Sequence, residues 1–248
     1  MDSGIVSYGL LYGCILIEAT LIIYVARSSH RNRLVSALLY LSCLFASDVA
    51  RSYAVRVYGV ASRRYFYVYW STDFLLVISA FILVCLFFRR ACFHQDQMWR
   101  FARLLLVFVF VLVVGISGLI FSQKYSDLFP YFVFEFNQNL YFACLVLNTL
   151  LYLLLQQIDS ADDQLGLLVC GVGIQFAGPA ATLALVHLTS AAQRFALSLN
   201  SFSIPVCTLG MLLVWAYAIV HVKEKAIQVA RREIPVLAEV AAHLNIQI

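Results

Sequence analysis

The sequence predicts an all-α fold: a polytopic membrane protein built as a bundle of seven transmembrane helices. Three observations predict this class, namely the composition, the recurrence of long apolar runs, and the shortness of the segments between them. Of the 248 residues, 63% are hydrophobic and 12% are charged, and the mean hydropathy is +0.88. Soluble domains average roughly 45–50% apolar and about 25% charged residues. The composition therefore excludes an ordinary soluble domain.

The apolar runs reach the length of about 20 residues that crosses a bilayer as a helix. The expected spans are Ile5–Ala26, Leu34–Tyr53, Tyr67–Phe88, Leu104–Phe121, Tyr131–Leu155, Leu165–Leu188 and Phe195–His221. Helices are expected because lipid offers the backbone no hydrogen-bond partners, and the alternating pattern of barrel strands is missing. The domain organisation is one transmembrane bundle, residues 1–222, followed by a tail, residues 223–248.

The distribution of Lys and Arg predicts that the N-terminus lies outside and the C-terminus in the cytoplasm. With that orientation the cytoplasmic set is Arg27, Arg31, Arg33, Arg89, Arg90, Arg100, Arg103, Lys223, Lys225, Arg231 and Arg232. The outer set is Arg56, Arg63, Arg64, Lys124 and Arg194. The larger set lies inside, as the positive-inside rule requires. No basic stretch follows Met1, so the first span is expected to stay uncleaved.

The tail carries apolar residues at alternating spacings of three and four. These are Ile227, Ala230, Ile234, Leu237, Ala241 and Leu244. This spacing is typical of an amphipathic helix, which either lies on the membrane surface or docks on a partner or a second copy. The lipid bilayer is the first expected partner, and nucleic acid is excluded because no soluble basic domain exists.

Charged and amide side chains inside the spans are candidate functional groups, because burying them in a membrane is costly. The candidate ligand-binding residues, which lie in the outer half of the bundle, are Asp48, Arg51, Asp73, Glu135, Asn139 and Asn200. One interpretation is a polar pocket for a ligand or ion that opens to the outside. The other is a structural set, with Asp48 paired to Arg51 on one helix face and hydrogen bonds between helices. Glu18 and Asn148 lie deeper, toward the inner side.

Aromatic residues crowd the same outer end, chiefly in the run Tyr65-Phe66-Tyr67-Val68-Tyr69-Trp70. An interfacial aromatic belt explains them, and the alternative is an aromatic-lined ligand mouth. The sixth span carries small residues on one face, including Gly171 and Gly178, with Gln175 between them. Such a face lets a helix backbone approach closely, so it is a second candidate partner surface.

Several chemistries are tested and set aside. The last span has no lysine for a retinal Schiff base, and no histidine pair has the depth needed for haem ligation. The seven cysteines show no metal-ligand spacing. No cofactor and no metal are therefore expected. Gly115-Ile116-Ser117-Gly118 matches the GxSG pattern of rhomboid proteases, with His187 on the sixth span, and an intramembrane serine protease stays the minor enzymatic alternative.

The layout and the aromatic run Tyr65–Trp70 resemble uncharacterised bacterial seven-helix membrane proteins of an acidobacterial type. More distantly, the chain is similar to the seven-helix sensor modules of bacterial histidine kinases. The resemblance implies a multi-pass protein of the plasma (bacterial inner) membrane. It implies no individual functional residue.

Three functions are compatible with these observations. The first is a non-enzymatic sensor or receptor-like module, or an accessory subunit, which binds something at the outer residues and reports through its inner tail. The second is a small proton- or cation-coupled transporter that uses the same carboxylates. The third is a purely structural subunit of a membrane complex, which needs no site.

Overall fold

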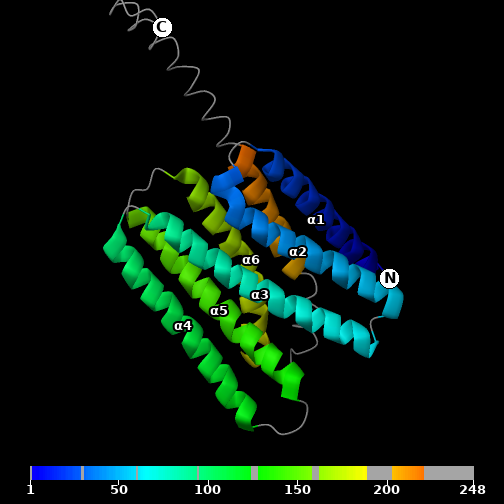
Figure 1. Ribbon diagram of the computed structural model, residues 1–248. Helices are drawn as coiled ribbons and strands as arrows, with labels where there is room; N and C mark the ends of the chain where they lie inside the picture. The colour runs from blue at the N-terminus through cyan, green and yellow to red at the C-terminus, as the bar shows by residue number, and fades with distance from the viewer. Residues whose placement is uncertain are drawn as a thin grey trace, which may run out of the picture.

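The computed structural model describes residues 2–28, 31–59, 61–93, 95–123, 128–157, 162–188 and 203–220 (Figure 1). The helices are α1 (Asp2–Arg27), α2 (Arg31–Tyr58), α3 (Arg63–Ala91), α4 (Asp96–Gln123), α5 (Leu128–Gln157), α6 (Asp163–Leu188) and a seventh helix (Ser203–Val220). Each of the seven is long and apolar enough to cross a membrane. The predicted all-helical fold, with seven helices able to span a membrane, is confirmed. The tail 223–248 and the first residues expected in the last span lie outside the described residues, and the orientation of the termini stays a prediction.

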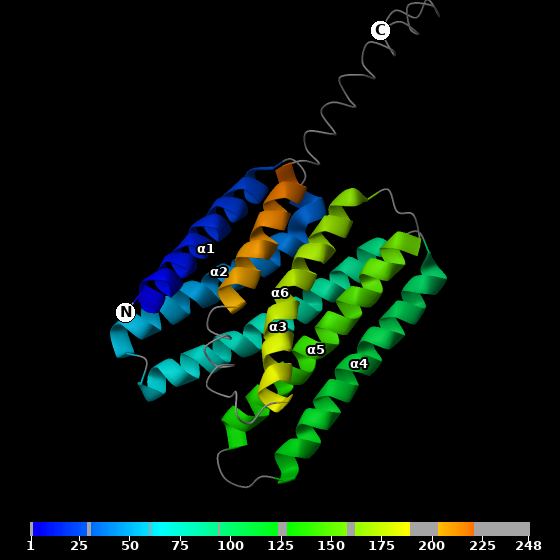
Figure 2. The same cartoon turned by 180° about the vertical axis from the view of Figure 1, so that it is seen from behind.

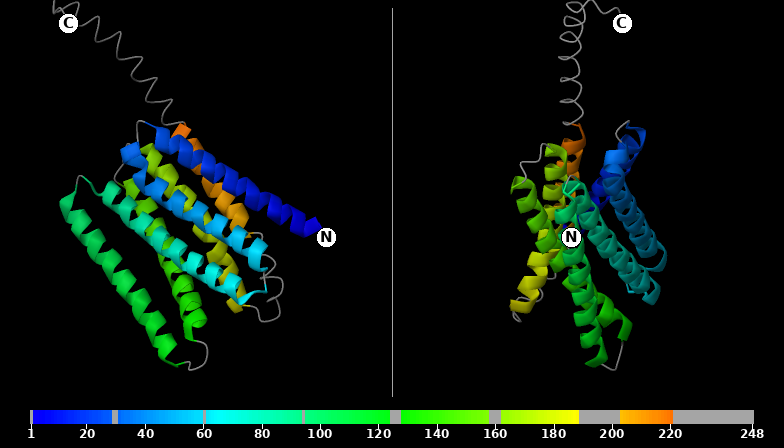
Figure 3. Two further views of the ribbon diagram at one scale, coloured as in Figure 1. Left: turned by 45° about the vertical axis from the view of Figure 1, so that its right-hand side comes forward. Right: turned by 60° about the vertical axis from the view of Figure 1, so that its left-hand side comes forward.

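Six of the described helices close into a ring, and α4 lies outside it. Each of α1, α2, α3, α5 and α6 packs on the next in that order. The seventh helix completes the ring between α6 and α1 (Figure 2). The outlying α4 packs on α5 and, over a shorter stretch, on α3 (Figure 3). We call the end of the bundle at which α1 begins and α2 ends the N-side, and the end at which α1 stops at Arg27 the far side.

Local sequence signals explain where neighbouring helices stop and start. Gly59 has φ of 75°, a left-handed conformation that favours glycine and that ends α2. Ser62 then caps α3, because its side chain accepts a hydrogen bond from the Arg64 backbone N–H. At the far side Asp162 caps α6 through a bond from the Leu165 N–H, at 3.2 Å.

Asp162 also forms an ion pair that ties two helices together at the far side. Its Oδ2 accepts from the Nη2 of Arg90 at 2.7 Å and from the Nε of Arg90 at 3.0 Å. Arg90 belongs to the last turn of α3, whereas Asp162 opens α6. Asp162 therefore has a structural role, since it anchors the start of α6 to the end of α3.

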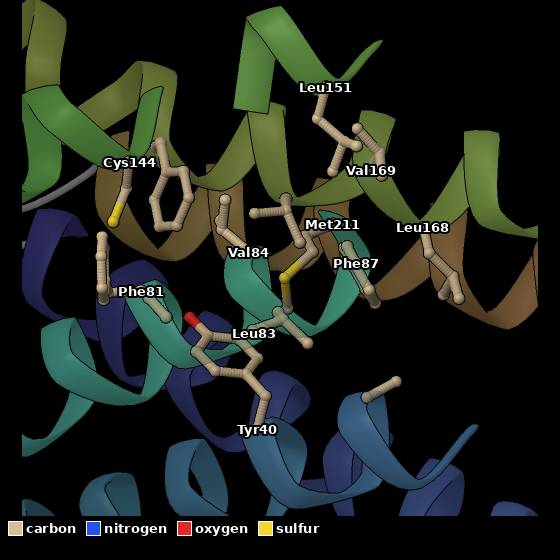
Figure 4. Packing of buried hydrophobic residues seen from close by; sticks show 14 of the residues in the cluster. Tyr40, Phe81, Leu83, Val84, Phe87, Cys144, Leu151, Leu168, Val169 and Met211 are labelled. Carbon is tan, nitrogen blue, oxygen red and sulfur yellow. The ribbon is translucent and has the colours of Figure 1, made fainter. Parts of the chain in front are cut away.

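The apolar core lies around α3, which contacts α2, α4, α5 and α6. Its inward face repeats at helical spacing, with Val77, Val84 and Phe87 all fully buried. In Figure 4, Leu83 and Val84 of α3 lie near Met211 of the seventh helix and Tyr40 of α2. Side chains from helices far apart in the sequence thus share one interior.

The small-residue face of α6 is covered by the seventh helix. A Cβ added at Gly171 would lie 2.6 Å from Cδ1 of Trp215, and one at Gly178 would lie 2.6 Å from Sγ of Cys207. The indole N–H of Trp215 also donates to the Leu168 carbonyl at 2.9 Å. A partner that used this face, as the sequence suggested, would first have to displace the chain's own seventh helix.

The outer surface of α4 is apolar along almost its whole length. Phe101, Leu104 and Leu119 each expose more than two thirds of their surface, at 69%, 69% and 68%. Water would make such a surface costly, whereas lipid tails cover it without loss. The exposed side chains of α4 therefore fit a lipid-facing helix.

We predict that Gly171→Ala destabilises the bundle, because the added methyl group overlaps the buried Trp215 ring. Overpacking of this kind costs about 1–3 kcal/mol. Gly166→Ala on the same helix is the matched control, since nothing lies within 4 Å of its added Cβ. Unfolding in mixed micelles by a denaturing detergent measures both variants. Equal stability of the two variants would contradict the close packing of α6 on the seventh helix.

Candidate functional site

The candidate site is a polar cluster that joins three helices in the N-side half of the bundle. Nη2 of Arg51 on α2 lies 3.1 Å from Oδ1 of Asp73 on α3. Oδ2 of Asp73 accepts a bond of 2.6 Å from Nδ2 of Asn137 on α5. Nε of Arg51 donates to Oγ1 of Thr72 at 2.8 Å. We call these four residues, together with Tyr69, the Arg51 cluster.

Residues one turn apart on α3 hold the guanidinium in place. The Thr72 hydroxyl donates to the backbone carbonyls of Val68 and Tyr69, which leaves a lone pair on its oxygen directed at Arg51. The guanidinium carbon of Arg51 stands 4.7 Å from the centre of the Tyr69 ring. A cation over an aromatic face is attracted by the ring quadrupole. The long Arg51 side chain is thus held by a carboxylate, a hydroxyl and an aromatic ring.

The cluster is only partly covered. The side chains of Arg51 and Asp73 keep 21% and 19% of their surface exposed. Asn137, by contrast, is buried, at 4%. The ion pair therefore lies at the border between the packed interior and the surroundings.

The structure brings together two of the six residues predicted for the site, and it changes their pairing. The sequence suggested that Arg51 pairs with Asp48 on its own helix, but Arg51 reaches across to α3 instead. The reason is that Thr72 and Asp73 present two acceptors to the guanidinium. Asp48 lies one turn before Arg51, half-buried and within reach of its charge.

The helical register of α5 explains why the prediction missed Asn137. Glu135 and Asn139 are four residues apart and share a face, whereas Asn137 lies between them on the opposite side of the helix. Asn137 faces the interior and joins the Arg51 cluster. Asn139 instead donates to Oγ of Ser117 on α4, at 3.3 Å. Glu135 is half-buried and forms no ion pair with another described residue.

Two further sequence candidates fall partly or wholly outside the described residues. Asn200 lies between α6 and the seventh helix, in the segment 189–202. The side chain of His187, the proposed partner of Ser117, is likewise outside the described part of α6. Ser117 itself is fully buried on α4 and contacts Asn139. Its contact fits a role in packing α4 against α5.

A second group of polar side chains lies deeper, where α1 and α2 meet α6 and the seventh helix. Glu18 of α1 is fully buried. The Tyr40 hydroxyl on α2 donates to Oε1 of Gln175 on α6 at 2.9 Å. The thiol of Cys14 on α1 lies 3.8 Å from the carbonyl oxygen of Pro205. This second group is separate from the Arg51 cluster in its members and in its hydrogen bonds.

Asn148 does not extend that group toward a transport path. Its Nδ2 donates to the Val169 carbonyl at 3.0 Å, and Gly173 leaves room for it on α6. The contact joins α5 to α6 inside the core. Asn148 is therefore accounted for by helix packing.

Arginines and tyrosines stack on one another at the N-side. Arg56 lies over Tyr12, Arg63 over Tyr67 and Arg64 over Tyr58, with guanidinium carbons 5.4–5.7 Å from the ring centres. The predicted aromatic belt thus includes Arg–Tyr stacks, which suit the boundary between lipid and water.

No protein-family model, curated protein or solved structure matches the chain. The resemblance to bacterial seven-helix proteins and sensor modules therefore stays a prediction. Among the described residues, no three His, Cys, Asp or Glu side chains gather where they could hold a metal ion. The function is argued from the polar clusters alone.

We predict that Arg51 and Asp73 are energetically coupled. A double-mutant cycle with Arg51→Gln and Asp73→Asn should give a coupling of about 1–2 kcal/mol. This value exceeds the roughly 1 kcal/mol of an exposed pair, and it falls below the about 3–5 kcal/mol lost when a fully buried pair is broken. Unfolding in mixed micelles measures the cycle. Additive effects of the two substitutions would rule out the pair as a stable contact.

Proposed function

We propose that the chain is a non-enzymatic sensor or receptor-like membrane module, or an accessory subunit, whose responsive element is the Arg51 cluster. The observation that carries the proposal is a partly exposed ion pair, Arg51–Asp73, which connects three helices through Asn137. Within the cluster, the Thr72 hydroxyl donates to backbone carbonyls and the Asp73 carboxylate accepts from Arg51 and Asn137, so the hydroxyl is not hydrogen-bonded to the carboxylate. The guanidinium, carboxylate and amide of the cluster are suited to binding a charged ligand.

The argument from geometry has three steps. First, α2, α3 and α5 are held together by charged contacts inside an apolar bundle, so breaking them changes how the helices pack. Second, the exposed fractions of Arg51 and Asp73 leave room for an outside charge to compete. Third, a ligand that binds one of the two arrangements more tightly shifts the population toward it. These are the requirements of a sensing element.

We further propose that the N-side faces outward across a bacterial inner membrane, as the distribution of Lys and Arg indicates. Signals received at the Arg51 cluster would then reach the cytoplasm through the far side and the tail 223–248. A second copy or a partner protein that docks on this tail completes the proposal. The similarity in layout to the sensor modules of histidine kinases agrees with it.

A proton- or cation-coupled transporter is the second candidate, and one observation favours it. Glu18 is a fully buried carboxyl inside the apolar span of α1. Reconstituted vesicles distinguish the two candidates. Net uptake of a cation or of protons, lost in Glu18→Gln, would favour transport over sensing.

We predict that loss of the Arg51–Asp73 ion pair changes backbone hydrogen exchange far from the Arg51 cluster. Backbone hydrogen exchange of the full chain in lipid nanodiscs should differ between wild type and Asp73→Asn at the far-side ends of the helices and in peptides from 221–248. Arg90→Gln, which removes the other ion pair, is the matched control and should leave the N-side unchanged. Changes confined to the turns around Arg51, Asp73 and Asn137 would mean that the cluster only holds helices in place.

A parallel purification from native membranes in mild detergent tests for a ligand. Mass spectrometry identifies the small molecules and proteins that stay bound to wild type, Asp73→Asn and Arg90→Gln. A small molecule retained by wild type and Arg90→Gln but lost from Asp73→Asn would support a receptor site at the Arg51 cluster. One retained equally by all three would place binding elsewhere.

A further inference from the structure

Glu18 lies well inside the apolar span of α1. The helix runs from Asp2 to Arg27, and Glu18 lies in its far-side half, inside the apolar span. None of its surface is exposed. It shares the buried face of α1 with Cys14 and Leu21, one turn away on either side. A helix rise of about 1.5 Å per residue places the carboxyl well over 10 Å from either end of the span.

Both carboxyl oxygens of Glu18 are buried and accept no hydrogen bond from any described residue. The carboxylates of the two ion pairs described above differ in this respect. Asp73 accepts from Arg51 and Asn137, and Asp162 accepts from Arg90. A buried polar group without a partner is costly, and a buried bare charge costs far more.

Two donors on α1 and α2, the Cys14 thiol and the Tyr40 hydroxyl, are engaged with acceptors other than Glu18. The Cys14 thiol points to the Pro205 carbonyl, and the Tyr40 hydroxyl donates to Gln175. Ser47, next to Asp48 on α2, is buried, and its hydroxyl has no partner among the described residues. The arrangement therefore leaves unfilled oxygen acceptors in the deepest part of the bundle.

Glu18 has an electrostatic interaction with a second carboxyl. Asp48 on α2 lies within electrostatic reach of Glu18, and both act on Cys14 and Tyr40. The positive charge nearest along α2 is that of Arg51, which is bound to Asp73. Two neighbouring carboxyls in an apolar interior cannot both be ionised without a compensating cation.

We propose that Glu18 and Asp48 form a binding site for one small monovalent cation, either a proton or a sodium-sized ion. Oxygen ligands are the ones that hard cations prefer. Glu18 supplies two oxygens from α1, and Asp48 adds its carboxyl from α2. The site shares no member with the Arg51 cluster, so its test is independent of the test of the sensing proposal.

The titratable groups around the site come from the helices packed on α1. They are Cys14 on α1 itself, and Tyr40, Asp48 and Arg51 on α2. The described part of the seventh helix adds Cys207 and Tyr217, of which Cys207 faces Gly178 and Tyr217 is exposed. Any pH effect at Glu18 therefore has to be separated from these groups by substitution.

The test is chemical labelling of the full chain in lipid nanodiscs with dicyclohexylcarbodiimide. This apolar reagent adds to a carboxyl in its protonated form, and mass spectrometry of the Glu18 peptide measures the product. Labelling is followed over a pH series in N-methylglucamine chloride, and then at one pH with sodium chloride at the same ionic strength. Asp96, exposed at the start of α4, is the control carboxyl in each sample.

We expect labelling of Glu18 to fall as the pH rises, while Asp96 stays unlabelled. Protection by sodium beyond that of N-methylglucamine would identify a sodium-sized ion as the ligand. Equal labelling in the two salts would identify the proton. If sodium protects, Asp48→Asn should raise the sodium concentration for half protection by on the order of tenfold, which corresponds to about 1.4 kcal/mol.

Infrared spectroscopy makes the test independent of whether the reagent reaches the site. A protonated Glu18 gives a carboxyl C=O band that disappears in Glu18→Gln and persists in Asp48→Asn. Labelling of Glu18 that depends neither on pH nor on sodium would overturn the proposal. So would a spectrum without a Glu18 band at any pH, combined with an unlabelled Glu18 peptide.

Discussion

The ion pair between Arg51 and Asp73 is the contact around which the N-side half of the bundle is arranged. An arginine inside an apolar helix needs a partner, because lipid supplies none. Here the partner lies on α3, and its second oxygen is taken by Asn137 of α5. One carboxylate therefore fixes the relative position of three helices. Thr72 and Tyr69 complete the surroundings of the guanidinium, so its placement is specific.

An arginine is paired with an aspartate at each end of the bundle, but the two pairs differ in their surroundings. At the far side, Arg90 and Asp162 join the end of α3 to the start of α6 in a more exposed pair, which also caps a helix. Between the two ion pairs, apolar packing dominates, with the glycines of α6 letting Trp215 and Cys207 approach its backbone. Glu18 is the exception to this arrangement, since it is buried deeply and yet has no described partner.

Hydropathy predicted the seven helices well because crossing a membrane imposes a length and a composition on each segment separately. The polar pairing was less predictable, because it depends on how the helices sit against one another. Asp48 and Arg51 share a helix face, so the sequence suggested a local pair, whereas the structure places a stronger acceptor set on α3. The signal that could have found Asn137 was its position opposite the Glu135–Asn139 face. Which face points inward was decided only by packing.

Closure of the ring joins the first and last described helices, which are separated by 191 positions at the Cys14–Pro205 contact. During synthesis, α1 enters the membrane long before its neighbour exists. Until the seventh helix emerges from the ribosome, the Gly171 face of α6 and the Cys14 face of α1 have lipid or the insertion machinery in place of their final contacts. Assembly is thus ordered in time, because the Cys14 face of α1 gains its contact with the seventh helix only after that helix has been translated.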